Sequence, residues 1–351
     1  MGLRFRHRYL DSCTPGWEND VCLLGDVDGD GYADVVIGGK EGQDNLVWYR
    51  YPSWTRHTIG TANLEAGGVL LDITGNGLLD LVAGRPSGGR ELYWLENQGT
   101  GRWPMRVIED GLCKYHDQAV GDVDGDGKAE IVVASQEAGM LVYYDLPPDP
   151  RVSPWPSECR HLVCEDLVVE GLAVADLDGD GRQEIVAGPN WFEPPESAGN
   201  RWTRHQFADF RDCRVAVGDL NRDGWPEIVL CEGEADRGRL SWFEGRGWER
   251  EHLIADDLFH PHSLALASFG GGVELDVFAA EMGLGRHERA RVLIYVNQGQ
   301  GQFEEFLVAV GHPTHEAKVG DLGKTGLPDI VGKPYRPGRY VEWWENVSWP
   351  G

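Results

Sequence analysis

Short apolar runs alternate with polar, glycine-rich turns along the whole chain. The runs are rich in Val, Ile and Ala and are shorter than most helices, so they predict β-strands. The clearest example is the segment 119–135, in which one apolar run leads into a turn of alternating carboxylates and a second apolar run follows. The basic unit is therefore predicted to be strand, polar turn, strand.

This unit recurs seven times. The turns begin at Asp26, Asp72, Asp122, Asp176, Asp219, Ser268 and Asp321. The copy at Ser268 is worn, and the copies at Asp72 and Asp321 are weaker than the other four. A repeat of roughly 50 residues that fills the chain overrides the two-domain organisation that a length of 351 residues would otherwise suggest.

Each repeat continues with an aromatic third strand and a fourth strand, as in 46–49 and 54–57. Four short antiparallel strands repeated around an axis are typical of a propeller blade. The last repeat stops after Trp344 without a fourth strand, and residues 3–10 match the missing element. We therefore expect an all-β, seven-bladed β-propeller closed by the N-terminal strand in the last blade, with residues 1–351 as one domain.

The turns place oxygen-bearing side chains at alternating positions in a Gly-rich path, which lets ligands converge on a hard cation. Oxygen ligands in flexible geometry favour several structural Ca²⁺ ions over Mg²⁺. The predicted ligands are Asp26, Asp28, Asp30 and Asp34; Asp72, Thr74, Asn76 and Asp80; Asp122, Asp124, Asp126 and Glu130; Asp176, Asp178, Asp180 and Glu184; and Asp219, Asn221, Asp223 and Glu227. The second turn is expected to be weaker because two of its ligands are neutral. The sixth and seventh are expected to be empty.

A formal charge of −26 argues against nucleic acid or an anionic membrane as a partner, and no apolar run approaches membrane-spanning length. Seven Cys without a paired pattern favour free thiols and a reducing compartment. The first residues have no apolar signal core. The expectation is a monomer, cytoplasmic for the chain as given, and secreted or periplasmic if a signal was removed.

The Asp-x-Asp-Gly-Asp-Gly turns with their Val/Ile strands resemble FG-GAP/VCBS-type repeats over essentially the whole chain. Such propellers serve as adhesion modules, integrin-like heads and sugar lyases, so the resemblance implies a fold and leaves the function open. The Trp-Thr-Arg-His outer strands and the segment Tyr115-His116-Asp117 are similar to the propellers of rhamnose–glucuronate lyases and aldosulose/anhydrofructose dehydratases. That similarity implies elimination chemistry on a sugar.

Residues just before each inner strand are expected to meet at the propeller axis, on the face opposite the cation turns. Six residues before each turn stand Asp20, Ala66, His116, Glu170, Cys213, His262 and His315. Six of the eleven histidines map to this face, namely His116, His260, His262, His287, His312 and His315. The other five occupy the repeated outer-strand position, where blade packing is the expected role.

Basic residues fall in loops of the same face. They are Lys40, Arg85, Arg90, Lys114, Arg211, Arg214, Arg237, Arg286, Arg289, Lys333, Arg336 and Arg339. One interpretation is a site for a carboxylate or another anion. The other is that these residues neutralise the acidic side chains interspersed with them. Trp17 and Tyr335 lie outside the strand pattern and are candidates to stack on a sugar ring.

These features predict a lyase or dehydratase acting by β-elimination on a uronate- or keto-sugar-containing saccharide. The catalytic candidates are His116, Tyr115, His262, His315 and Tyr335. The substrate-binding candidates are Trp17, Arg85, Arg214, Lys333, Arg336, Glu170 and Asp20. A further divalent metal on the axis is an additional expectation. Two alternatives stay open: a non-catalytic, calcium-stabilised propeller that binds a glycan or a protein, and a glycoside hydrolase using Glu170 with Asp20 or Glu316.

Overall fold

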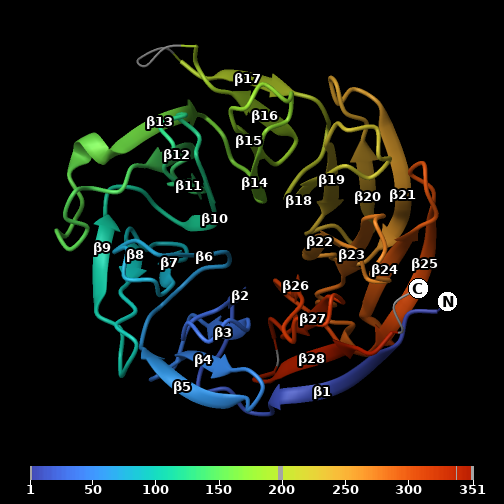
Figure 1. Cartoon of the computed structure of the whole chain (residues 1–351), viewed down its shortest axis with the longest axis horizontal. Helices are drawn as coiled ribbons and strands as arrows, with labels where there is room; N and C mark the ends of the chain where they lie inside the picture. Colours follow the sequence, from blue (N-terminus) through green and yellow to red (C-terminus); the bar gives the residue numbers. More distant parts are fainter. Residues whose placement is uncertain (1, 197–200, 337, 349–351) are drawn as a thin grey trace.

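The computed structural model describes residues 2–196, 201–336 and 338–348. Seven four-stranded antiparallel sheets stand in a ring around a central channel (Figure 1). The strands of blades 1 to 4 are β2 (Val21–Gly25), β3 (Asp34–Gly38), β4 (Leu46–Arg50) and β5 (Thr55–Gly60); β6 (Val69–Leu71), β7 (Asp80–Gly84), β8 (Leu92–Leu95) and β9 (Met105–Glu109); β10 (Tyr115–Gly121), β11 (Glu130–Ser135), β12 (Met140–Tyr144) and β13 (Arg160–Glu165); β14 (Leu172–Ala175), β15 (Glu184–Ala187), β16 (Asn190–Glu193) and β17 (Thr203–Gln206).

The remaining blades follow the same order. Their strands are β18 (Cys213–Gly218), β19 (Glu227–Glu232), β20 (Gly238–Phe243) and β21 (Glu251–Leu258); β22 (Ser263–Ala267), β23 (Asp276–Ala280), β24 (Arg291–Asn297) and β25 (Phe303–Val310); β26 (Lys318–Gly320), β27 (Asp329–Gly332), β28 (Val341–Asn346) and β1 (Phe5–Asp11). Two short 3₁₀ turns, η1 (Ser157–Cys159) and η2 (His287–Arg289), lie in loops.

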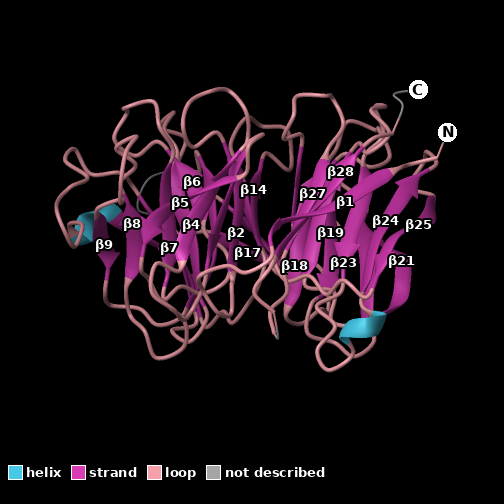
Figure 2. Ribbon diagram, turned by 90° about the horizontal axis from the view of Figure 1, so that it is seen from below, coloured by secondary structure: helices cyan, strands magenta, loops and turns pink. Residues whose placement is uncertain are grey.

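The ring closes through the first strand of the chain. β1 pairs antiparallel with β28, in a register that runs from Phe5 opposite Asn346 to Asp11 opposite Val341. This pairing covers the edge that β28 would otherwise expose. The predicted seven-bladed propeller with N-terminal closure is confirmed. Figure 2 shows the ring from the side, with both termini near one face and η2 at the other.

Apolar side chains fill the spaces between neighbouring sheets. Val82 and Trp94 of blade 2, for example, pack with Ile131 and Val142 of blade 3 in one buried cluster. Apolar area removed from water contributes roughly 25 cal/mol per Å², so these contacts between blades supply the main driving force for closure. No helix in the described part of the chain is long and apolar enough to cross a bilayer. All seven Cys are free thiols.

The polar turns between the first two strands of a blade define one face of the ring, the cation-turn face. In six blades the ninth turn residue is a buried carboxylate that accepts a hydrogen bond from the N–H of the second. In blade 3, for example, Val123 N–H donates to Glu130 at 2.9 Å. The connections between blades and between second and third strands form the opposite face, the axial loop face, and position the candidate site.

Candidate functional site

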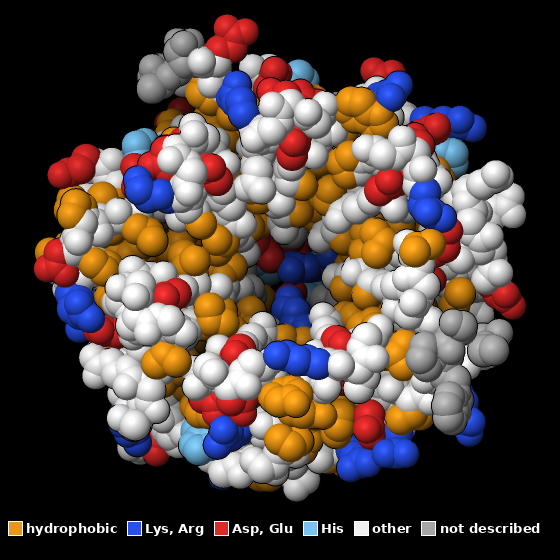
Figure 3. All heavy atoms as spheres, in the orientation of Figure 1, with side chains coloured by type: hydrophobic (Ala, Val, Ile, Leu, Met, Phe, Trp, Pro, Cys, Tyr) orange, Lys and Arg blue, Asp and Glu red, His pale blue; other side chains and the backbone are white. Residues whose placement is uncertain are grey.

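Five of the seven residues predicted to converge on the axis lie in one connected group of side chains. Asp20, Glu170, His262 and His315 end the connections that lead into inner strands, and His116 is the second residue of β10. All five side chains are buried, with at most 5% exposure of the residue. Figure 3 looks down the central channel, where Lys, Arg and acidic side chains gather at depth. A cluster of titratable groups withdrawn from water is thus built from five different blades.

Three of these residues form a compact donor set, the axial triad of His116, Glu170 and His262. His116 Nε2 lies 3.2 Å from Glu170 Oε1, and His262 Nε2 lies 3.4 Å from Glu170 Oε2. One ligand atom from each residue lies within 4.8 Å of the others. Glu170 Oε2 makes no hydrogen bond among the described residues. Two imidazoles and a carboxylate are a donor set that fits a divalent metal ion.

An inner layer sits one residue closer to the strands, at Asp117, Arg214 and Glu316. Arg214 NH2 lies 2.8 Å from Asp117 Oδ1 and 3.0 Å from Glu316 Oε1, and Asp117 Oδ2 lies 2.7 Å from His116 Nδ1. The sequence pattern indicated Arg214 and Glu316 as site residues but gave no role to the Asp117 carboxylate. Counting five residues before each turn, in addition to six, identifies this layer.

On the other side of the channel, Lys333 is fully buried. Its Nζ donates to the carbonyl oxygen of Asp20 at 3.0 Å and lies 3.2 Å from His315 Nδ1. Lys40 Nζ is 2.6 Å from the Asp20 carboxylate and 3.2 Å from Glu65 Oε1. The sequence did not predict Glu65 as a site residue, nor did it predict that Lys40 pairs with Asp20. Both side chains belong to loops whose path the sequence does not reveal.

The rings of His262 and His315 stack on one another. Their surroundings shift the two pKa values in opposite directions. Burial alone would lower the pKa of His262, but the adjacent carboxylates of Glu170 and Glu316 raise it to about 10. Burial and the neighbouring Lys333 ammonium hold the pKa of His315 well below its usual value. Burial likewise lowers the pKa of Lys333, to about 8.

The carboxylate of Glu170 shifts towards the ionised form. Burial would raise its pKa, yet His116, His262 and Arg214 lower it to about 2. A general acid of a glycoside hydrolase needs a raised pKa, so this environment does not favour Glu170 as a proton donor.

The structure places several predicted site residues elsewhere. Tyr115 packs in the apolar cluster between blades 2 and 3, and its hydroxyl donates to the carbonyl of Arg90 at 3.1 Å. Arg85 pairs with Glu91 at 3.1 Å, whereas Arg336, which pairs with Glu18, lines a hollow beside the axial residues. Tyr115 is therefore a core residue, because the alternation of β10 turns it away from the channel.

Many of the basic side chains on this face have an acidic partner in the described structure. Besides Arg214, Lys40, Arg85 and Arg336, this holds for Arg237, which lies 2.9 Å from Asp256. The interpretation that these residues neutralise interspersed acids therefore fits the structure better than an unpaired anion site.

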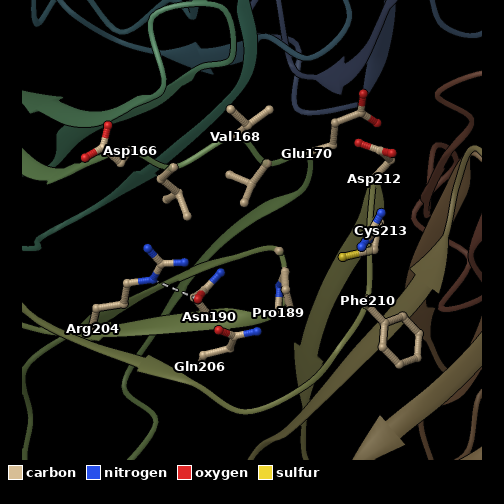
Figure 4. A pocket seen from close by; sticks show the side chains of 14 residues that line it. Asp166, Val168, Glu170, Pro189, Asn190, Arg204, Gln206, Phe210, Asp212 and Cys213 are labelled. Atoms are coloured by element: carbon tan, nitrogen blue, oxygen red, sulfur yellow. Dashed lines mark hydrogen bonds between the residues drawn. The ribbon is translucent and has the colours of Figure 1, made fainter.

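Two cavities open near the axis. One, of about 340 Å³, lies between blades 4 and 5 and is lined by Glu170 and Asp212 at one end and by Arg204 and Asn190 at the other (Figure 4). The second, of about 320 Å³, is the aromatic hollow, lined by Trp17, Glu18, Glu41, Tyr335, Arg336 and Gly338. The Tyr335 ring lies 4.9 Å from that of His315, so the hollow adjoins the axial cluster.

The predicted cation turns differ in how well they fit an ion. Three present a close group of carboxylates: Asp26, Asp28 and Asp34; Asp122, Asp124 and Glu130; Asp176, Asp178 and Glu184. In the fifth-blade turn, Asn221 Nδ2 donates to Glu227 Oε1 at 2.9 Å, which aligns the side-chain amide with the carboxylate. Oxygen-rich groups of this kind suit Ca²⁺, and Ca²⁺ binding in these turns stays a prediction.

Comparisons with known proteins agree with the fold. The FG-GAP-like repeat family matches residues 26–83, 72–133 and 122–187. Three successive turn units within residues 26–187 are thus similar to the FG-GAP-like repeat, and the fold is the seven-bladed β-propeller that the turn pattern predicts. No curated protein that was compared matches the chain. The narrower resemblance to sugar-eliminating propellers stays a prediction.

Solved structures share the architecture at low identity. The structure of BBS1N in complex with ARL6DN, soaked with mercury, is 11% identical, with a TM-score of 0.61 and coverage of 98% of this chain and 96% of that chain. The V. cholerae biofilm matrix protein Bap1 is 10% identical, with a TM-score of 0.58 and coverage of 98% and 92%. At these identities the likeness shows the fold alone.

Proposed function

We propose that the protein is a calcium-stabilised binding propeller that holds a saccharide in the aromatic hollow of its axial loop face. The observation that carries this proposal is the hollow itself. Trp17 is half exposed and faces the same space as Tyr335, beside polar groups from Glu18, Glu41 and Arg336. Rigid aromatic faces with a few polar groups at the rim are the usual composition of a small-ligand site.

The charges around the hollow narrow the ligand class. Glu18 and Glu41 face the Arg336 guanidinium, which is already paired with Glu18, and the Arg339 guanidinium lies 4.5 Å from the centroid of the Trp17 ring. The deeper cations Lys40, Lys333 and Arg214 are held by the axial acids and carbonyls. A neutral saccharide, which offers hydroxyl donors to the two carboxylates, suits these groups better than a polyuronate.

The same fold occurs in a protein that was solved with a partner and in a biofilm matrix protein, so a binding role is compatible with it. Several residues proposed for chemistry are also committed to structural contacts. Tyr115 lies in the core, and His116 and Arg214 both contact Asp117.

The test is a calorimetric screen of neutral and uronate-containing oligosaccharides against the protein. Replacement of either hollow aromatic, Trp17→Ala or Tyr335→Ala, is expected to weaken binding of a neutral hit at least tenfold. Tyr32→Ala, at a partly exposed aromatic in the first cation turn, is the matched control and is expected to leave affinity unchanged. Equal affinities for Trp17→Ala, Tyr335→Ala and Tyr32→Ala would place the ligand elsewhere.

The sugar-eliminating function is the second candidate, and one observation favours it. His262 and His315 stack with centroids 4.4 Å apart while their pKa values are driven in opposite directions. Such a pair can supply an acid and a base at one pH, which β-elimination requires. His315→Asn is expected to abolish the formation of an unsaturated, near-ultraviolet-absorbing product if this candidate is correct.

A further inference from the structure

A second group of potential metal ligands lies far from the axis, at the seam where the ring closes. The seam cluster consists of His7 on β1, Glu342 on β28 and His312 in the connection between blades 6 and 7. Its ligand atoms lie within 4.8 Å of one another. Figure 1 shows β1 running beside β28 at this point. Three segments that are distant in the sequence thus contribute one residue each.

His7 differs from the equivalent histidines of other blades. In blades 3, 4 and 5 the outer-strand histidine lies opposite an aromatic residue of the third strand. Its Nε2 contacts the carboxylate that stands two residues after that aromatic residue. The three carboxylates are Asp145, Glu193 and Glu244. His7 faces Trp344 in the same register, but its Nε2 is directed at Glu342, two residues before Trp344. This orientation turns the imidazole towards His312 and the axial loop face.

The ring geometry shows the same difference. His57, His161, His205 and His252 stack on their aromatic partners at interplanar angles of 16°, 16°, 12° and 4°. His7 lies at 34° to Trp344 and makes an edge contact with His312 at 4.7 Å. Its packing on the aromatic ring is therefore loosened in favour of the approach to Glu342 and His312.

Glu342 provides the independent sign of a ligand. The side chain of Glu342 has no exposed area. Its Oε1 lies 3.0 Å from His7 Nε2 and 2.7 Å from His312 Nδ1. Its other oxygen, Oε2, is buried and makes no hydrogen bond of ordinary length among the described residues. The Tyr9 hydroxyl, whose pKa burial and Glu342 raise, stands nearby but is neutral and does not compensate the charge. No Lys or Arg within the described ranges pairs with Glu342. An ionised carboxylate in this state is costly unless a charge compensates it.

We propose that the seam cluster is a metal site that takes Zn²⁺ or a similar late first-row divalent ion and fastens the ring closure. Two imidazole nitrogens and one carboxylate leave a coordination position for water, and they suit such ions better than Ca²⁺. His7 and His312 are 31% and 27% exposed at the side chain, so an ion can enter from solvent. His7 lies on the first strand of the chain and Glu342 on the last. Because these strands meet only when the ring is closed, an ion bound to both stabilises the closed ring.

Equilibrium dialysis of chelator-treated protein against Zn²⁺, with excess Ca²⁺ to occupy oxygen-only sites, tests the proposal. His312→Gln and His7→Gln are each expected to bind one equivalent fewer than the wild type. His57→Gln is the matched control, because His57 holds the equivalent outer-strand position, and it is expected to bind the wild-type amount. His262→Gln removes a ligand of the axial triad. A loss of bound Zn²⁺ in that variant measures binding at the axis and does not affect the comparison of the seam variants with the wild type.

Thermal unfolding gives the second readout. Zn²⁺ at about 100 times its dissociation constant is expected to raise the midpoint of His262→Gln, which lacks a ligand of the axial triad, by roughly 3 °C or more. It is expected to leave the midpoint of the double variant with His262→Gln and His312→Gln unchanged. Equal Zn²⁺ equivalents in wild type and both seam variants would overturn the proposal. An equal decrease of the midpoint in His312→Gln with and without Zn²⁺ would also overturn the proposal. That result would mean that the three side chains stabilise the closed ring by their hydrogen bonds alone.

Discussion

His262 and His315 lie face to face with ring centroids 4.4 Å apart, yet carboxylates surround the first and an ammonium group adjoins the second. His262 Nδ1 is 3.3 Å from Glu316, and its Nε2 is 3.4 Å from both Glu170 and Glu234. His315 Nδ1 faces Lys333 Nζ at 3.2 Å. One stacked pair therefore holds a proton on one ring and excludes it from the other.

The first prediction concerns these protonation states. Burial lowers the pKa of both rings, but the carboxylates raise that of His262 to about 10, whereas Lys333 lowers that of His315 further. In metal-free protein, ring ¹⁵N chemical shifts are expected to show His262 as an imidazolium and His315 as neutral near pH 7. Both rings titrating near pH 6.5 would contradict the described network.

The second prediction concerns Lys333, whose pKa burial lowers from 10.5 to about 8. Between pH 8 and pH 10.5 the Lys333 amine is therefore neutral in the folded state but protonated in the unfolded state. Its burial destabilises the folded state by the full amount below pH 8, and this destabilisation decreases as the pH rises towards 10.5. The free energy of unfolding of wild type, minus that of Lys333→Met, is expected to rise by about 3 kcal/mol over this interval. Denaturant titrations at pH 7 and 10.5 measure it, and a flat difference would exclude the shift.

The third prediction concerns the cation turns. Wild type is expected to bind at least three Ca²⁺ ions, because three turns bring carboxylates together in the structure. Asp124→Asn in the blade 3 turn is expected to lose one equivalent. Asp321→Asn is the control, since the seventh turn offers Gly323 and Thr325 at the third and fifth positions. Calcium analysis after gel filtration decides; equal losses in both variants would contradict the assignment.

The fourth prediction concerns an asparagine clamp that repeats in blades 2, 6 and 7. The side-chain amide of Asn297 donates to the carbonyl of Leu220 in the preceding blade at 2.8 Å and to that of Leu275 in its own blade at 3.0 Å. Asn97 and Asn346 make the equivalent pairs of bonds. Asn297→Ala removes the donor to one buried and one partly buried carbonyl and is expected to cost about 2 kcal/mol of unfolding free energy. Gln298→Ala, at the exposed neighbour, is expected to be neutral within about 0.5 kcal/mol.

The fold could be predicted from the sequence because period, turn chemistry and strand length repeat seven times and agree. The same counting placed His116, Glu170 and His262 together, since residues at equal distances from equivalent turns meet at the axis. Tyr115, which was named from its segment and not from this count, lies in the core because one step along a strand reverses the side-chain direction. The counting missed Glu65, the role of Lys40 at Asp20 and the clamp asparagines, since these contacts join different blades through side-chain paths that no single repeat encodes.

Whether the axial loop face binds a saccharide without transforming it can be decided by incubating the protein with its tightest-binding oligosaccharide and following the sugar by NMR and near-ultraviolet absorbance. We predict that the saccharide is recovered unchanged after prolonged incubation, while Trp17→Ala and Tyr335→Ala weaken its binding and His315→Asn does not. Accumulation of an unsaturated sugar that is abolished in His315→Asn would refute the binding role and establish elimination chemistry at the axis.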